Sequence, residues 1–467
     1  MRIVALLVLG LAASASAQDG PVSHIMLEEG AQAEPADETD ADADVPEREV
    51  PDYDGRVDAP TSPGRKLLWI PRVLFAPLYF VTEFVLRRPF SRLSRLAEQS
   101  SSDPLRFFVF GKNQQAAIAP TLLVDFGEQP SVGFYLRWNE VGHPRHKLRF
   151  YFATWGKDWL RGSVLTRWEP EHERWRFELR FEGNRRSDGR FYGLGSEIGA
   201  NPDRELANEG ARFSYRSLDV SVSFEAEPWR ASQLRTYAGI RETEFGDNIF
   251  RGSSIEAQVS RNVFDVPPGY AEGYFIWNQG IEFTLNTRRP RPANTSGVLV
   301  HVFGEHAFDL NDPEGARWLK YGASLGVFAD VRAGHVIELV ASAKLSETLA
   351  GEIPFTELFD VGGRNPMRGF RTGWLRGESA GVLMLQYSWP IWAFLDGLAH
   401  FGVGNVFDGR FDDFDLANTR MSFGIGFAAV NSLDHRFDFT VAWGTDTFER
   451  GPNVVSTRIM GGATLEF

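Results

Sequence analysis

The sequence contains one motif with the spacing of a hydrolase nucleophile. Residues Gly322–Gly326 read G-x-S-x-G, which in hydrolases holds the serine hydroxyl on a sharp turn between a strand and a helix. Here the motif lies inside an alternating run, WLKYGASLGVFADV, which is typical of a strand without such a turn. We therefore expect no serine catalysis, and the sequence predicts a protein that is not an enzyme.

Two groups of side chains could bind metal ions. His143 and His146 have no neighbouring carboxylate cluster, so a turn is the better interpretation of that pair. Three aspartates could hold calcium in an external loop, although the full spacing of a calcium loop is absent: Asp412, Asp413 and Asp415. No phosphate-binding glycine loop precedes a helix, and no basic stripe suggests nucleic acid. The sequence thus predicts no resident metal, no cofactor and no nucleic-acid partner.

The most unusual polar stretch is Phe359–Trp374, FDVGGRNPMRGFRTGW. Its glycines and Pro366 exclude a regular helix or strand. Arg368 and Arg371 flank an apolar Gly-Phe tip. This composition is unusual for a solvated loop and natural for one that folds into a polar cavity and contacts its wall. An ordinary surface loop is the alternative interpretation.

The elements that must position this loop are strands. From about Ala117 to the last residue, about sixteen short segments alternate apolar with polar or small residues, separated by turn-forming residues. One face is large and apolar, as at Leu383 and Leu385, whereas the opposite face carries Gln386 and Ser388. A closed barrel with its apolar face in lipid and a polar lumen explains this phase better than a soluble sandwich. The predicted fold class is all-β, a 16-stranded antiparallel transmembrane β-barrel.

The N-terminal residues predict export. Within residues 1–17, Arg2 precedes an apolar run, Ile3–Leu11, and an A-S-A cleavage site, which together make a signal peptide. The chain of 467 residues contains no cysteine, and a barrel closed by its own backbone hydrogen bonds needs no disulfide. Export and the strand pattern together predict a barrel over residues 104–467 that lies in the bacterial outer membrane and contacts its lipids.

Two further segments are predicted before the barrel. Residues 18–63 are strongly acidic, with thirteen Asp or Glu and only two Arg between Met26 and Asp58, and they predict a disordered tether. Residues 64–100 contain an apolar run that charges and prolines interrupt, followed by an arginine cluster. This pattern predicts a Pro-interrupted amphipathic helix, broken near Pro77, at the membrane interface. A plug inside the barrel and a spanning helix are the alternatives.

The C-terminal segment has the pattern of a final barrel strand. Ile459, Leu465 and Phe467 fall on one face, which should contact lipid, and the chain ends on the aromatic residue itself. Such an end could serve as a signal for an assembly machinery. Gly461 and Gly462 weaken the strand preference. We therefore expect a weak seam where the last strand meets the first.

Four short motifs occur in an order that is typical of one barrel family. Along the chain they are RFYGLGSE at Arg190–Glu197, MRGF at Met367–Phe370, LQYSWP at Leu385–Pro390 and GNVFD at Gly404–Asp408. With these motifs, a terminal aromatic residue and about sixteen strands, the chain resembles the BamA/TamA-type barrels, the bacterial surface antigens, over roughly Ala117–Phe467.

The resemblance implies both a site and a function. Family members fold a long loop into the barrel between the eleventh and twelfth strands, and its motif corresponds here to Met367, Arg368, Gly369 and Phe370. The implied function is to assist insertion or translocation of proteins or lipids, with an unknown client and with the barrel assembly machinery as a partner during biogenesis. A passive pore or structural barrel without clients is the alternative. Family members usually carry POTRA domains before the barrel, and some carry a phospholipase domain, but residues 18–115 match neither pattern.

The resemblance also raises the question of what Arg368 contacts. In the family, the loop arginine usually meets acidic residues of the wall, but the positions that look equivalent here are neutral, Gln386 and Gly402. The strand phase offers two other luminal carboxylates, Asp438 on the fifteenth segment and Glu338 on the eleventh. We expect Arg368 to pair with Asp438 across the lumen, with Glu338 and Gln386 as the other candidate partners.

Overall fold

The computed structural model describes residues 109–110, 115–125, 128–170, 174–196, 210–229, 231–288, 296–312, 315–332, 334–364, 366–392, 395–429 and 436–464. The predicted signal peptide, acidic tether and amphipathic helix lie outside these residues, as do the last three residues of the chain. Among the described residues, none of the helices has the length and apolar character that a membrane span requires.

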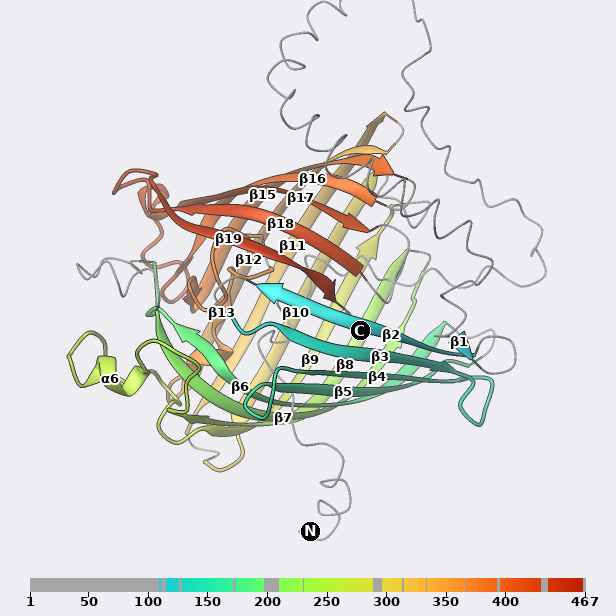
Figure 1. The fold of residues 1–467 in the computed structure, drawn as a ribbon, viewed down its shortest axis with the longest axis horizontal. Helices are drawn as coiled ribbons and strands as arrows, with labels where there is room; N and C mark the ends of the chain where they lie inside the picture. Colours follow the sequence, from blue (N-terminus) through green and yellow to red (C-terminus); the bar gives the residue numbers. More distant parts are fainter. Residues whose placement is uncertain are drawn as a thin grey trace, which may run out of the picture.

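All but two of the described strands form one antiparallel sheet that closes on itself (Figure 1). Each barrel strand pairs with the next along the chain, and the last pairs with the first. The sixteen barrel strands are β2 (Ala116–Asp125), β3 (Ser131–Asn139), β4 (His146–Thr154), β5 (Leu160–Trp168), β6 (Trp175–Phe191), β7 (Ala211–Ala226), β8 (Ser232–Gly246), β9 (Tyr274–Asn286), β10 (Gly297–Asp309), β11 (Arg317–Arg332), β12 (His335–Ala350), β15 (Ser379–Trp392), β16 (Leu395–Phe407), β17 (Arg420–Ala429), β18 (Arg436–Thr445) and β19 (Val454–Thr464). The predicted closed, sixteen-stranded antiparallel barrel is therefore confirmed.

The remaining described elements are short and lie before the first barrel strand or in the connections between strands. A two-residue strand, β1 (Val109–Phe110), pairs with the start of β2. Helix α6 (Ile255–Val259) and the 3-10 turn η7 (Leu416–Asn418) lie in the β8–β9 and β16–β17 connections. Between β12 and β15 lie the 3-10 turn η6 (Phe355–Glu357) and a small hairpin formed by β13 (Phe359–Asp360) and β14 (Arg376–Gly377).

The two ends of the barrel differ in their connections. Residues 192–210, 247–273, 351–378 and 408–419 all connect strands at one end, which we call the long-loop end. Connections at the opposite, short-turn end include the brief turn between β11 and β12. This asymmetry is the usual arrangement of outer-membrane barrels, whose long loops face outward.

The two faces of the wall differ as the alternation predicted. In β15, Leu383 and Leu385 are 51% and 46% exposed on the outer face, whereas Met384, Gln386 and Ser388 are buried on the inner face. The expectation of a polar lumen is wrong at the long-loop end, where three clusters of buried apolar residues lie beneath the loops. The reason is that the β12–β15 connection returns into the barrel and buries apolar side chains there.

The seam between β19 and β2 is short within the described residues. Four residue pairs join these strands, from Met460 opposite Asp125 to Ala463 opposite Leu122. By comparison, eight pairs join β2 to β3 and ten join β18 to β19. The backbone therefore holds this junction with fewer described hydrogen bonds than its neighbours.

Candidate functional site: the inward loop at the seam

The tip of the β12–β15 connection is folded on itself and buried. The Gly363 amide donates to the Phe370 carbonyl at 2.9 Å, and the Phe370 amide donates to the Met367 carbonyl at 3.0 Å. Met367 and Phe370 are fully buried, and Arg368 is 7% exposed. The loop therefore lies within the barrel and is not an ordinary surface loop.

The tip is seated on the last strands before the seam. The Gly369 amide donates to Ser422 Oγ of β17 at 2.8 Å. A Cβ at Gly369 would overlap the carbonyl group of Trp443 in β18, so only glycine permits this approach. The Phe370 ring in turn occupies the space above Gly444 of β18, 2.7 Å from where a Cβ would stand. The MRGF motif thus packs against a part of the barrel wall where small residues leave room for it.

Aromatic residues of the same loop and of the β6–β7 connection pack against the tip. Phe370 meets Trp374 edge to face with ring centroids 5.9 Å apart, and Trp374 stacks on Tyr192 at 4.6 Å. Tyr192 belongs to the RFYGLGSE motif of the β6–β7 connection, so two of the sequence motifs meet here. We call the buried group around the tip the loop-tip cluster: Phe303, Phe359, Val361, Met367, Phe370, Trp374, Leu375, Ala380, Val382 and Val406.

Asp438, the carboxylate expected to pair with Arg368, has another loop arginine as a partner. Asp438 Oδ1 instead accepts from Arg364 Nη1 at 3.2 Å. Arg368 lies on the β16 side of the lumen, where its charge acts on His400. Met367, which precedes Arg368 in the loop, lies against Gly402 of β16.

The other two candidate partners lie next to each other on the wall that continues from His400. Gln386 is the register partner of both His400 on β16 and Glu338 on β12. Gln386 Nε2 donates to Glu338 Oε2 at 3.1 Å, and both side chains are buried. The structure therefore places an imidazole, an amide and a carboxylate in one row across three adjacent strands.

A residue that the sequence did not single out joins the loop to the seam. Arg458 of β19 is 4% exposed, and its Nε lies 3.1 and 3.3 Å from the two carboxylate oxygens of Asp125 in β2. Its Nη1 donates to the carbonyl oxygen of Gly363 in the loop. One guanidinium thus holds the first strand, the last strand and the inward loop. The inward phase of Arg458 was evident from the sequence, but its partners were not.

A second anchor holds the start of the loop. Glu357 of η6 accepts from Arg241 Nη1 at 2.9 Å, Tyr274 Oη at 2.9 Å and Lys320 Nζ at 3.1 Å. Burial alone would raise the pKa of Glu357, but Arg241 and Lys320 outweigh it and lower this pKa to about 2. Because the pKa is depressed, the anchor is stabilising above the ordinary value of 4.5 and is lost only as the pH falls toward 2.

The motifs weighed for catalysis or metal binding have other places in the fold. Gly322–Gly326 lies wholly within β11, with no adjacent helix. His146 begins β4, and its amide donates to the His143 carbonyl in a turn. Asp413 and Asp415 accept hydrogen bonds from loop amides, those of Asp408 and Ala417. In the part of the chain that the structure describes, His, Asp and Glu side chains form no group of three suited to a metal ion.

The C-terminal residues are described only in part. Ile459 lies on the outer face of β19, between the inward-facing Arg458 and Met460. Leu465 and Phe467 lie outside the described residues. The predicted orientation of the last residues toward lipid therefore remains a prediction.

The barrel is similar in structure to known outer-membrane proteins, whereas the sequence matches no protein-family model and no curated protein. BamA from Haemophilus ducreyi lacking POTRA domains 1–3 superposes with a TM-score of 0.54 at 12% identity, over 75% of this chain and 70% of that one. CdiB from Acinetobacter baumannii gives 0.47 at 11%, over 75% and 60%, and CdiB from Escherichia coli gives 0.46 at 11%, over 74% and 63%. By its fold, this chain is a closed sixteen-stranded barrel that is similar to the barrel of BamA.

Proposed function

We propose that the chain is an outer-membrane barrel of the BamA/TamA type that assists insertion or translocation of proteins or lipids. In this proposal the inward loop holds the seam between β2 and β19 closed. The observation that carries it is Arg458, which contacts Asp125 across the seam and Gly363 in the loop. A seam joined by four described residue pairs depends on such a side-chain clasp more than longer junctions do.

The alternative, a passive pore, finds less support in the lumen. The loop-tip cluster and the two neighbouring apolar clusters occupy the long-loop end, where a pore needs water. The closed barrel should accordingly conduct ions poorly in planar bilayers.

A disulfide across the seam tests the proposed function. Val124 and Gly461 are register partners on β2 and β19, and the chain has no native cysteine. Val124→Cys/Gly461→Cys should close the seam on oxidation, because register partners place their Cβ atoms within disulfide range. We expect the oxidised protein to lose its ability to accelerate insertion of a reporter barrel protein, or movement of a labelled phospholipid, in vesicles. Reduction should restore that activity.

The control places the same cysteine pair across a junction that should not open. Val222→Cys/Ala238→Cys joins outward-facing register partners of β7 and β8, far from the seam. If the oxidised seam lock remains as active as this control, then the seam does not open during function and the proposal fails.

Biogenesis forms part of the same proposal. The outward position of Ile459 on the last described strand agrees with a C-terminal signal of Ile459, Leu465 and Phe467. We propose that the barrel assembly machinery recognises this strand and that the lipids of the outer membrane surround the finished barrel.

We also propose that Arg368 binds the wall at Glu338, in place of Asp438. The carboxylate lies in the row that continues from His400 through Gln386, and a buried guanidinium favours such an acceptor. Arg368→Ala should leave the heat-resistant barrel folded, weaken loop seating by about 1.5–3 kcal/mol and expose residues 362–377 to protease. Limited proteolysis with thermal unfolding measures both effects.

The matched control is Arg371→Ala, because the Nε of Arg371 is buried without a hydrogen-bond partner in the described part of the chain. That variant should remain resistant to protease. In a double-mutant cycle, Arg368→Ala and Glu338→Gln should be strongly non-additive. Independent, additive effects would show that the two side chains do not interact.

A further inference from the structure

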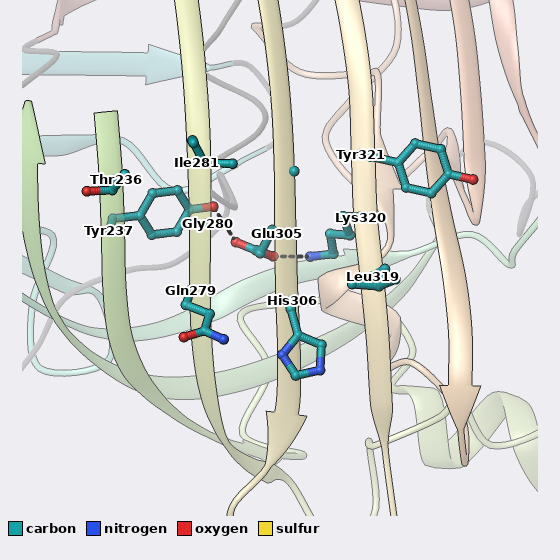
Figure 2. A pocket seen from close by; sticks show the side chains of 11 residues that line it. Thr236, Tyr237, Gln279, Gly280, Ile281, Glu305, His306, Leu319, Lys320 and Tyr321 are labelled. Atoms are coloured by element: carbon teal, nitrogen blue, oxygen red, sulfur yellow. Dashed lines mark hydrogen bonds and ion pairs between the residues drawn. The ribbon is translucent and has the colours of Figure 1, made fainter. Parts of the chain in front are cut away.

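A groove of about 560 Å³ crosses the wall over β8, β9, β10 and β11 (Figure 2). It opens on the outer face. Its floor is the backbone of Tyr237, Glu305 and Lys320, whose side chains point into the lumen. There Tyr237 Oη donates to Glu305 at 2.8 Å, and Lys320 Nζ lies 3.4 Å from Glu305. The residues on either side of that row, whose side chains point outward, form its sides. A groove with such a lining faces the membrane.

The groove exists because one outward position lacks a side chain. A Cβ at Gly304 would meet no atom within 4 Å, so the space above this residue is open. Its neighbours in register are Ile281, which is 51% exposed, and Tyr321. Gly304 therefore leaves an open slot between two projecting side chains.

Two polar side chains border one end of the slot. Gln279 and His306 are register partners on β9 and β10, and Figure 2 shows them next to each other. Neither side chain makes a hydrogen bond within the residues that the structure describes. A polar group that faces hydrocarbon without a partner is costly. These two donors therefore need an acceptor that the protein does not supply.

The depth of these side chains indicates the acceptor. The next pair toward the long-loop end is Trp277 and Phe308, which are register partners on the same strands. Outward aromatic residues of this kind mark the membrane interface. Gln279 and His306 lie two residues further in, about 5–7 Å along the strand. At that depth a membrane lipid presents the carbonyl groups that link its acyl chains to its head group.

We propose that this groove binds one membrane lipid of the leaflet at the long-loop end. An acyl chain lies in the slot over Gly304, and the linkage carbonyls accept hydrogen bonds from the Gln279 amide and the His306 imidazole. The volume lies within the range of specific small-molecule sites. The site is independent of the seam and of the inward loop.

The test measures lipid bound to the full-length protein. The protein is reconstituted in phosphatidylethanolamine and phosphatidylglycerol vesicles, extracted into mild detergent and examined by native mass spectrometry. We expect one retained phospholipid on the wild type. Gly304→Leu fills the slot and should reduce the retained fraction about tenfold, and Gln279→Leu/His306→Leu should reduce it by a smaller factor.

The matched control is Ala323→Leu, which adds the same bulk at another exposed outward position, on β11. This variant should retain lipid as the wild type does, and heat-modified migration should show that all variants are folded. Equal retention by Gly304→Leu and Ala323→Leu would overturn the proposal. It would also be overturned if a photoreactive residue at position 304 cross-linked in cells to a protein and not to lipid.

Discussion

Replacing Gly369 with valine is expected to unseat the inward loop and raise the ion conductance of the barrel at least about tenfold. A valine Cβ would overlap the Trp443 carbonyl, which belongs to the β18 backbone and cannot move without disturbing the register with β17 and β19. Overpacking of this kind costs about 1–3 kcal/mol. The loop would also lose the hydrogen bond from the Gly369 amide to Ser422. Each 1.4 kcal/mol changes the ratio of unseated to seated loop about tenfold.

Planar-bilayer recording measures this effect, and heat-modified migration shows whether the variant is folded. Gly304→Val is the control, because it makes the same change at a strand glycine where a Cβ meets open space. That control should conduct as the wild type does. If Gly369→Val conducts no more than Gly304→Val, the seating of the loop does not close the lumen, and the two other apolar clusters must close it.

The barrel was predictable from the sequence because lipid imposes a simple rule on every strand. Most outward residues in the lipid-facing part of a strand are apolar, so Leu383 and Leu385 reveal the phase of β15 without any knowledge of its neighbours. The inner face follows no such rule. The type of residue there depends on what fills the lumen. At the long-loop end the lumen is filled by a loop whose sequence has no regular alternation of apolar and polar residues, so its packing could not be predicted.

Of the site, the sequence predicted which residues form the inward loop but not the contacts that they make. The composition of the loop indicated that Arg368 lies inside, and it does. Strand phase also showed that Asp438 faces inward, but it could not tell which loop arginine reaches that carboxylate. The answer, Arg364, depends on where Gly369 seats. Arg458 could not be linked to Asp125 because their contact depends on the register of barrel closure.

Replacing Arg458 with methionine is expected to loosen the seam and the loop together. The substitution leaves Asp125 without its bidentate partner, and breaking a buried ion pair in this way costs about 3–5 kcal/mol. It also removes the donor to the Gly363 carbonyl. Introduced into the Val124→Cys/Gly461→Cys background, it should slow disulfide formation across the seam. In the cysteine-free protein, it should make residues 362–377 accessible to protease.

A control separates this coupling from the general loss of an ion pair. Arg216 and Glu244 form a similar pair between β7 and β8, with side chains that are 67% and 53% exposed. Arg216→Met should change neither the seam nor the loop, since exposed pairs contribute about 0–1 kcal/mol. The informative result for Arg458→Met is the correlation of its two effects. A loop that becomes accessible while the seam cysteines still react at the wild-type rate would show that Arg458 holds the loop only, and control of the seam would have to lie elsewhere in the barrel.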